Sequence, residues 1–135
     1  MQNAATYDNV VLDVYDFLEE RIESAEALGI PRERIVVDPG IGFGKTLQHN
    51  VRLLAALSLY HALGSPILLG ASRKRFIGTL TGADMPRDRM PGSLAVALHA
   101  LSQGVQILRV HDILETRQAT NLQMALIGPM IGAEA

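Results

Sequence analysis

Apolar residues recur along parts of the chain with the spacing of amphipathic helices. Between residues 7 and 28, apolar side chains such as Val10, Val14, Phe17 and Leu18 return every three or four positions, which places them on one helical face. Similar stripes predict further helices over residues 47–61, 93–103 and 112–125. The pattern therefore predicts four helices.

Three shorter runs are largely apolar and contain β-branched residues, which is typical of strands. They are Ile35–Val37, Ile67–Leu69 and Val105–Val110. The first run contains no polar residue, so we expect this strand to be buried on both faces.

Helices and strands alternate along the chain, with a whole helix between successive strands. Such crossover connections require parallel strands. The predicted fold is therefore α/β, with three parallel strands and four helices in one domain over residues 1–135. An open doubly wound sheet fits this order, and so does part of a (β/α)8 barrel, whose usual length is about 250 residues. Three strands alone cannot close a barrel.

Composition and charge exclude several classes of protein. The 135 residues are 48% hydrophobic, which is enough for one core, and the net charge of −2 gives no long-range attraction to nucleic acid or an anionic membrane. No apolar run reaches the roughly 18 residues of a membrane span, and residues 1–10 show no leader. The sequence has no cysteine, which suits a reducing cytosol. We expect a cytoplasmic protein with small-molecule ligands.

Polar clusters follow all three predicted strands. Asp38 follows the first strand, residues 72–74 (Ser-Arg-Lys) follow the second, and residues 109–112 (Arg-Val-His-Asp) end the third. The carboxyl ends of parallel strands share one edge, where ligands bind in both candidate architectures. Three clusters in phase on one edge therefore favour a binding site.

Each cluster also has a purely structural interpretation. Asp38 precedes a proline and could shape a turn, Arg73 and Lys74 could be a solvated helix start, and Asp112 could cap the last helix. Three coincident clusters outweigh these separate alternatives.

The charges predict a ligand with an anionic group and a ring rich in hydrogen-bond donors. Asp38 could accept hydrogen bonds from such a ring, and Arg109 and His111 could hold a phosphate-like anion. The other histidines, His49 and His61 among them, match no metal-site spacing. We therefore expect no metal ligand in this chain.

The stretch DPGIGFGKT, residues 38–46, fits neither common phosphate motif. A Walker A loop needs glycine where Pro39 stands, and the dinucleotide fingerprint fails from either Gly40 or Gly42. The glycines instead let the backbone turn tightly out of the strand. Phe43 then lies either at the mouth of the site or in the core.

Three motifs together resemble dihydropteroate synthases of folate biosynthesis. They are DPGIGFGK, then GASRKRFIG at residues 70–78, then ILRVHD at residues 107–112. The likeness runs to about Gly128, and Met1-Gln2 resembles the end of the family's TMQ segment. It implies the C-terminal part of a (β/α)8 barrel, with strands six to eight and four helices; the family's first half is absent from this sequence.

The resemblance implies a condensation of a pterin carrying a hydroxymethyl pyrophosphate with p-aminobenzoate, giving dihydropteroate and pyrophosphate. Asp38 would bind the pterin's amino and ring nitrogens, Lys74 would contact the ring, and Phe43 and Gly70 would line its pocket. These four residues would form the pterin side of the site.

The same resemblance places the other candidates around the second substrate and the leaving group. Arg109 and His111 would stabilise the departing pyrophosphate, and with Lys74 they are the expected catalytic residues. Ser72 and Arg73 would lie toward p-aminobenzoate, where sulfonamides compete. Magnesium is implied with its protein ligand outside this chain, and the full-length protein is expected to be a homodimer.

Two other functions remain open at this point. The absent half favours a non-catalytic pterin- or phosphate-binding module that is inactive alone. A related pterin-binding methyltransferase is the third candidate, although the SRK and RVHD segments suit a pyrophosphate and p-aminobenzoate site better.

Overall fold

A computed structural model describes residues 6–130 of the chain. Met1-Gln2, which carries part of the family resemblance, lies outside this range. The α-helices are α1 (Val10–Ala27), α2 (Leu47–Ala55), α3 (Arg75–Thr81), α4 (Met90–Ser102) and α5 (Ile113–Met130). Three segments of the described chain are 3-10 helices: η1 (Arg32–Arg34), η2 (Leu57–Leu63) and η3 (Pro86–Arg89). The strands are β1 (Leu68–Leu69) and β2 (Ile107–Leu108). The class is α/β and rich in helix.

The strands form a small parallel sheet, as the order of elements predicts. Leu68 of β1 pairs with Ile107 of β2. On the other side of β1, Val37 makes a single parallel bridge to Ile67, and the Leu68 N–H donates to the Val37 carbonyl at 2.8 Å. The expected first strand is therefore present as one bridge, and the expected count of three full strands is not observed.

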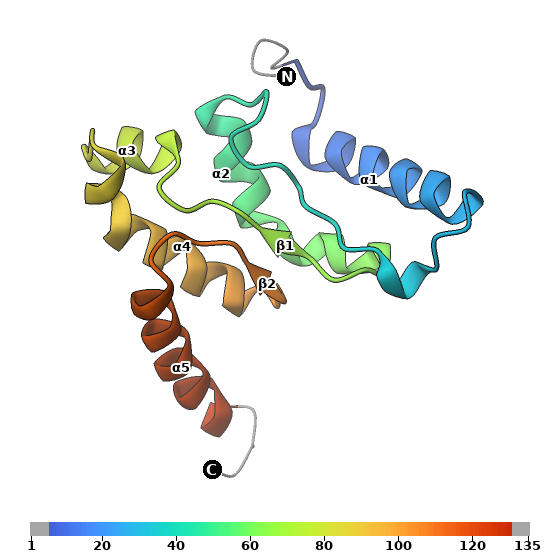
Figure 1. Cartoon of the computed structure of the whole chain (residues 1–135). Helices are drawn as coiled ribbons and strands as arrows, with labels where there is room; N and C mark the ends of the chain where they lie inside the picture. The colour runs from blue at the N-terminus through green and yellow to red at the C-terminus, as the bar shows by residue number, and fades with distance from the viewer. Residues whose placement is uncertain (1–5, 131–135) are drawn as a thin grey trace.

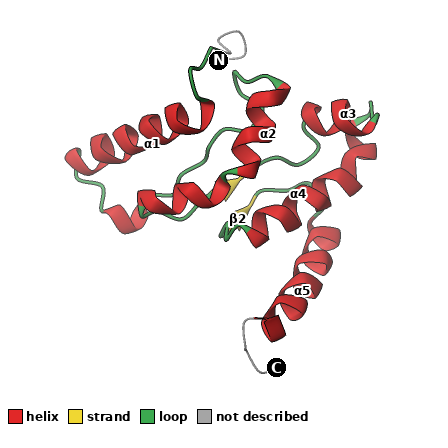
Figure 2. Ribbon diagram, turned by 180° about the vertical axis from the view of Figure 1, so that it is seen from behind, coloured by secondary structure: helices red, strands yellow, loops and turns green. Residues whose placement is uncertain are grey.

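One face of this sheet is covered and the other is open. Val37 and Leu69 are 3% and 2% exposed, whereas Val36 is 45% exposed. Helices α2 and α4 lie behind the strands in Figure 1 and in front of them in Figure 2. The prediction that residues 35–37 are buried on both faces is wrong, because no described element covers the side to which Val36 points.

The core lies between α1, the α2–η2 segment and the covered face of the sheet. Asn9 caps the start of helix α1, and its side-chain oxygen accepts hydrogen bonds from two N–H groups of the first turn. The buried Tyr60 of η2 donates its hydroxyl to the Val11 carbonyl at 2.8 Å and stacks on Tyr15. The buried stripe of α1 is narrower than the sequence predicts, since Phe17 is 60% exposed.

The middle of the chain contains more helical segments than the four predicted. The helix expected over 47–61 divides into α2 and η2, and α4 begins at Met90 because Pro91 is compatible with a first helical turn. The sequence pattern does not predict helix α3, because this helix contains Gly78, a poor helix former, and a polar interval follows it.

The crossover order places the ends of both strands and the loop after Val37 on one side of the molecule. In Figure 1, α5 extends away from the other helices, and the two ends of the described chain lie far apart. Among residues 6–130, no helix combines the length and the apolar character that crossing a bilayer would need.

Candidate functional site

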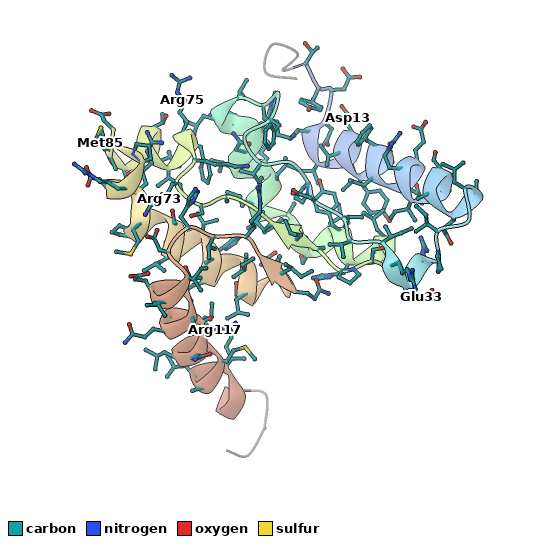
Figure 3. All side chains as sticks on the ribbon, viewed as in Figure 1. Asp13, Glu33, Arg73, Arg75, Met85 and Arg117 are labelled. Carbon is teal, nitrogen blue, oxygen red and sulfur yellow. The ribbon has the colours of Figure 1, made fainter. Side chains whose placement is uncertain are left out.

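The strand ends meet around one cavity of about 450 Å³. Figure 3 shows Arg73 at this junction, whereas Arg75 points to the outside. Every predicted site residue except Asp38 lines the cavity: Phe43, Gly70, Ser72, Arg73, Lys74, Arg109 and His111. The structure thus brings together residues that lie up to 68 positions apart in sequence, from 43 to 111.

The glycines of DPGIGFGKT form a tight loop after the Val37 bridge. Gly40, Gly42 and Gly44 have φ angles of 74°, 87° and 59°, a region that side chains with a Cβ disfavour. The Gly42 N–H donates to the buried Asn50 side chain at 2.8 Å. Three glycines are therefore needed to shape this loop, as the sequence suggests.

Two lysines bind carbonyl groups of this loop. Lys45 Nζ donates to the Gly40 and Phe43 carbonyls, both at 2.9 Å, and Lys74 Nζ donates to the Ile41 carbonyl. Burial lowers the pKa of both ammonium groups, and the negative charge of nearby Asp38 partly opposes this. Lys74 thus reaches the loop from the segment that follows β1, across the mouth.

Phe43 lies at the mouth and not in the core. The residue is 41% exposed, and Lys74 Nζ lies 4.5 Å from the ring centroid, within cation–π range. This contact decides between the two positions left open by the sequence. The exposed ring surface is a flat apolar wall beside a cation.

Asp38 combines a structural contact with a free acceptor. Its Oδ1 accepts a hydrogen bond from the Gly40 N–H at 2.8 Å, which closes the turn anticipated from the following proline. Among the described residues, Oδ2 accepts no hydrogen bond. The carboxylate is exposed and lies close enough to Lys45 and Lys74 to oppose the lowering of their pKa values by burial. It can still accept hydrogen bonds from a ligand.

Ser72 joins the loop after β1 to the loop after β2. Its Oγ accepts the His111 N–H at 3.2 Å and lies 2.9 Å from His111 Nδ1. If the hydroxyl donates to Nδ1, the other ring nitrogen, Nε2, carries a hydrogen and is available to a ligand. The ring of His111 is exposed, and the contact with Ser72 fixes its orientation.

Arg73 and Asp112 form a second link between the same two loops. The Arg73 guanidinium donates from Nη2 to Oδ1 at 2.7 Å and from Nε to Oδ2 at 3.2 Å. This hydrogen bond with Arg73 is the main cause of the lowered pKa of Asp112. Within the described chain, the Asp112 carboxylate bonds to Arg73 and not to the first turn of α5, so its predicted capping role is wrong.

Arg109 extends across the mouth over Gly70. Its backbone N–H continues the ladder to the Leu69 carbonyl at 2.9 Å, while its side chain is packed against the bare Cα of Gly70. Arg109 also contributes, after burial, to lowering the pKa of Lys74. Both cations therefore face the same volume, where an anion would relieve their repulsion.

The mouth suits an anion and a donor-bearing ring better than it suits a metal ion. Among residues 6–130, no three histidine, aspartate or glutamate side chains are grouped closely enough to hold a metal. Among the described residues, the carboxylates of the loops around the mouth include Asp38 and the Arg73-paired Asp112. Residues 6–130 by themselves therefore offer no group of side chains that fits a magnesium ion.

Sequence reasoning missed several residues that shape the site. Asn50 supports the glycine loop, and Ser93 and Arg89 bind the backbone of Arg73. Lys45 lies inside the motif and so could have been found there. The other three carry no local signal, because their partners lie 8, 20 and 16 positions away.

Comparison with known sequences gives a consistent set of relatives. Residues 1–111 match the family described as pterin binding enzyme. The dihydropteroate synthase of Escherichia coli (strain K12) is 44% identical over 127 residues, which are 94% of this chain and 45% of the relative. That of Haemophilus influenzae is 45% identical over 117 residues, or 86% of this chain and 42% of the relative. The chain spans less than half the length of these relatives.

Solved dihydropteroate synthase structures share this fold. The Xanthomonas albilineans enzyme with 4-aminobenzoic acid has a TM-score of 0.90 and 48% identity, covering 92% of this chain and 45% of that one. The same enzyme in complex with 7,8-dihydropteroate has a TM-score of 0.90 and 47% identity, covering 93% and 48%. The Thermus thermophilus enzyme in complex with 6HMPPP has a TM-score of 0.88 and 47% identity, covering 92% and 49%.

Proposed function

This chain belongs to the family of pterin-binding enzymes, and we propose that residues 1–135 form the C-terminal part of a dihydropteroate synthase with a (β/α)8 barrel. The similarity to whole dihydropteroate synthases at 44–48% identity supports this assignment. The open sheet face beside Val36 supports it as well, because further strands of a barrel would cover that face.

The proposed reaction joins 6-hydroxymethyl-7,8-dihydropterin pyrophosphate to p-aminobenzoate. The amine nitrogen of p-aminobenzoate forms a bond to the methylene carbon, the carbon–oxygen bond to pyrophosphate breaks, and the nitrogen loses a proton. The observation that carries this proposal is the single cavity that brings together an exposed aromatic ring and cations from two successive loops. A pterin and its pyrophosphate present the matching flat ring and negative charge.

Arg109 and His111 would hold the pyrophosphate in this reaction. The oxygen that leaves carbon gains negative charge as the bond breaks, and fixed donors aimed at it lower the barrier. Arg109 offers a planar set of N–H donors above Gly70, and His111 offers Nε2 because Ser72 faces Nδ1. Lys74, close to both Phe43 and Arg109, would supply a second positive charge.

The remaining candidates would bind the organic parts of the two substrates. Asp38 Oδ2 would accept hydrogen bonds from the pterin, and the Phe43 ring would pack against its face. Ser72 and Arg73 would lie toward p-aminobenzoate, where a sulfonamide would compete. Arg73 is half-buried and paired with Asp112, so its role would be to shape this wall.

Three further features of the proposed enzyme rest on parts of the protein outside this chain or on the sequence alone. Magnesium would be held by the pyrophosphate and by protein groups beyond these 135 residues. A second copy could cover the exposed apolar side chains of α5, such as Leu114 and Leu122, which are 82% and 63% exposed. A cytoplasmic location stays a prediction.

A complete enzyme tests the proposal. This chain would replace the 127-residue segment that it matches in the Escherichia coli dihydropteroate synthase, and the chimera would be given both substrates with magnesium. We expect dihydropteroate and pyrophosphate in equal amounts. A folded chimera that binds the pterin pyrophosphate without forming product would instead support the binding-module alternative, and methyl transfer from methyltetrahydrofolate would support the methyltransferase.

A further inference from the structure

Arg73 has an unfavourable backbone conformation in the middle of the site. Its φ is 56°, and within residues 6–130 no other residue with a side chain has a positive φ. A residue with a Cβ adopts this conformation only where its surroundings hold it, and such residues cluster at functional sites. Arg73 lies between Ser72 and Lys74, which both line the cavity. Its conformation therefore sets the directions of both neighbours.

Two residues of the following crossover hold the peptide groups of Arg73. The Arg73 N–H donates to Ser93 Oγ at 2.8 Å, and the Arg73 carbonyl accepts from Arg89 Nη1 at 3.0 Å. Ser93 Oγ in turn donates to the Arg89 carbonyl at 3.0 Å, and its side chain is buried. Hydrogen bonds thus fix Arg73 on both of its backbone polar groups.

Arg89 is itself held in place by backbone carbonyls and a glycine. Nε donates to the Ala83 carbonyl at 2.8 Å, and Nη2 donates to the Asp84 carbonyl at 2.7 Å. A Cβ on Gly78 would stand 2.7 Å from Arg89 Nε, so only glycine leaves room for this guanidinium. One side chain therefore ties the loop after α3 to the loop before it.

From this geometry, and resting on the proposed function, we infer that Ser93 and Arg89 are positioning residues of the ligand site. They hold Arg73 in its left-handed conformation, and three consecutive side chains then reach their partners. Ser72 meets His111, Arg73 meets Asp112, and Lys74 meets the Ile41 carbonyl. Ser93 and Arg89 do not line the cavity and need not touch a ligand.

The test compares Ser93→Ala and Arg89→Lys in the Escherichia coli chimera, each alone and combined with Arg73→Gly. Lysine keeps the charge of Arg89 but has one nitrogen for three carbonyl partners. We expect each single variant to lower kcat at least about fivefold, the effect of one lost hydrogen bond to a positioned group. In the Arg73→Gly background the further loss should be under about twofold, because glycine adopts this φ without help.

Matched controls separate positioning from a general loss of stability. Ser102 lies on the same helix α4, and its Oγ donates to the His99 carbonyl in the way that Ser93 Oγ donates to that of Arg89. Arg87 is an exposed arginine of the same 3-10 segment as Arg89. Ser102→Ala and Arg87→Lys should leave kcat unchanged, and melting temperatures of all variants should be measured beside the rates.

The result that overturns the inference is an equal loss of kcat in the Arg73 and Arg73→Gly backgrounds, or rates that follow melting temperature alone. An unmutated chimera that is folded but inactive would instead contradict the proposed function. The inference would then be judged on amide exchange of the 135-residue chain by NMR. Ser93→Ala should speed exchange of the Arg73 N–H at least about fivefold while Ser102→Ala does not, and identical rates would reject it.

Discussion

Arg109 occupies the space that a side chain on Gly70 would need. A Cβ added to Gly70 would stand 2.6 Å from Arg109 Nη2 and 2.9 Å from Nε. Gly70 has no positive φ, so alanine there would cause no backbone strain, and the three atoms nearest to its Cβ would all belong to Arg109. The pair therefore offers a way to move the proposed anion-binding group without removing it.

Gly70→Ala should weaken binding of the pterin pyrophosphate about tenfold, since a displaced guanidinium loses its charge-assisted hydrogen bonds. The melting temperature should stay close to that of the unmutated protein, because the end of Arg109 can swing aside. Calorimetric titration of the chimera measures the affinity. Gly128→Ala, whose added Cβ meets nothing within 4 Å, is the control. Unchanged affinity in Gly70→Ala would argue against an anion role for Arg109.

Lys74→Ala and Arg109→Ala should each reduce turnover of the complete enzyme at least about tenfold, the effect of losing a preorganised charged contact. Steady-state rates of dihydropteroate formation measure this. Arg34→Ala removes an exposed cation of η1, outside the residues that line the cavity, and should keep the full rate. Near-normal rates in both site variants would refute the assignment of these two residues.

Asp112→Asn should lower the free energy of unfolding at neutral pH and make it less sensitive to acid. The pKa of Asp112 in the folded protein lies below its ordinary value of 3.8, mainly because of the hydrogen bond from Arg73. The pair's contribution is therefore complete above about pH 4 and is lost as the pH falls through the lowered pKa. Urea unfolding between about pH 7 and pH 2 should show the two proteins converging at the acid end.

An exposed aspartate on α1, Asp16, provides the control for this experiment. The free energy of unfolding of Asp16→Asn should stay close to that of the unmutated protein at every pH. A constant gap between Asp112→Asn and the unmutated protein, down to the acid end of the range, would mean that the ion pair does not account for the loss of stability.

Gly92→Ala should destabilise the chain by packing and not through the site. Its added Cβ would overlap Cγ2 of Ile77, at the contact between α4 and α3. Overpacking of this kind costs about 1–3 kcal/mol, against a gain of up to about 1 kcal/mol from replacing a helical glycine. Thermal unfolding should therefore show a lower melting temperature, and a higher one would mean that the two helices separate without cost.

The order of helices and strands and the position of the site could be predicted from short stretches of the sequence. The parallel order follows from the alternation of helices and strands. The mouth follows from the polar residues that come directly after Val37 and Leu108 and three positions after Leu69. The extent of the strands was not predictable in this way. An apolar run indicates which residues can be buried, whereas the length of a β-strand depends on which adjacent strands are present to pair with it.

The sequence also did not show which side chains bind each other across long separations. Arg73 and Asp112 each had an adequate local role in the sequence, as a helix start and a helix cap, yet they bind each other across 39 positions. Arg89 gave no motif at all, because its three acceptors are backbone carbonyls that any residue could supply. Such contacts become visible only when the chain is folded.

The lowered pKa of Lys74 has a consequence for how this region can evolve. Burial is its main cause, and the positive charges of Arg109 and Lys45 add to it. The negative charge of Asp38 offsets part of this repulsion in the free protein, and a bound anion would offset more of it. A neutral residue in place of Arg109 would remove one source of this repulsion while weakening the hold on an anionic ligand. Selection for stability and selection for anion binding would therefore act in opposite directions at Arg109.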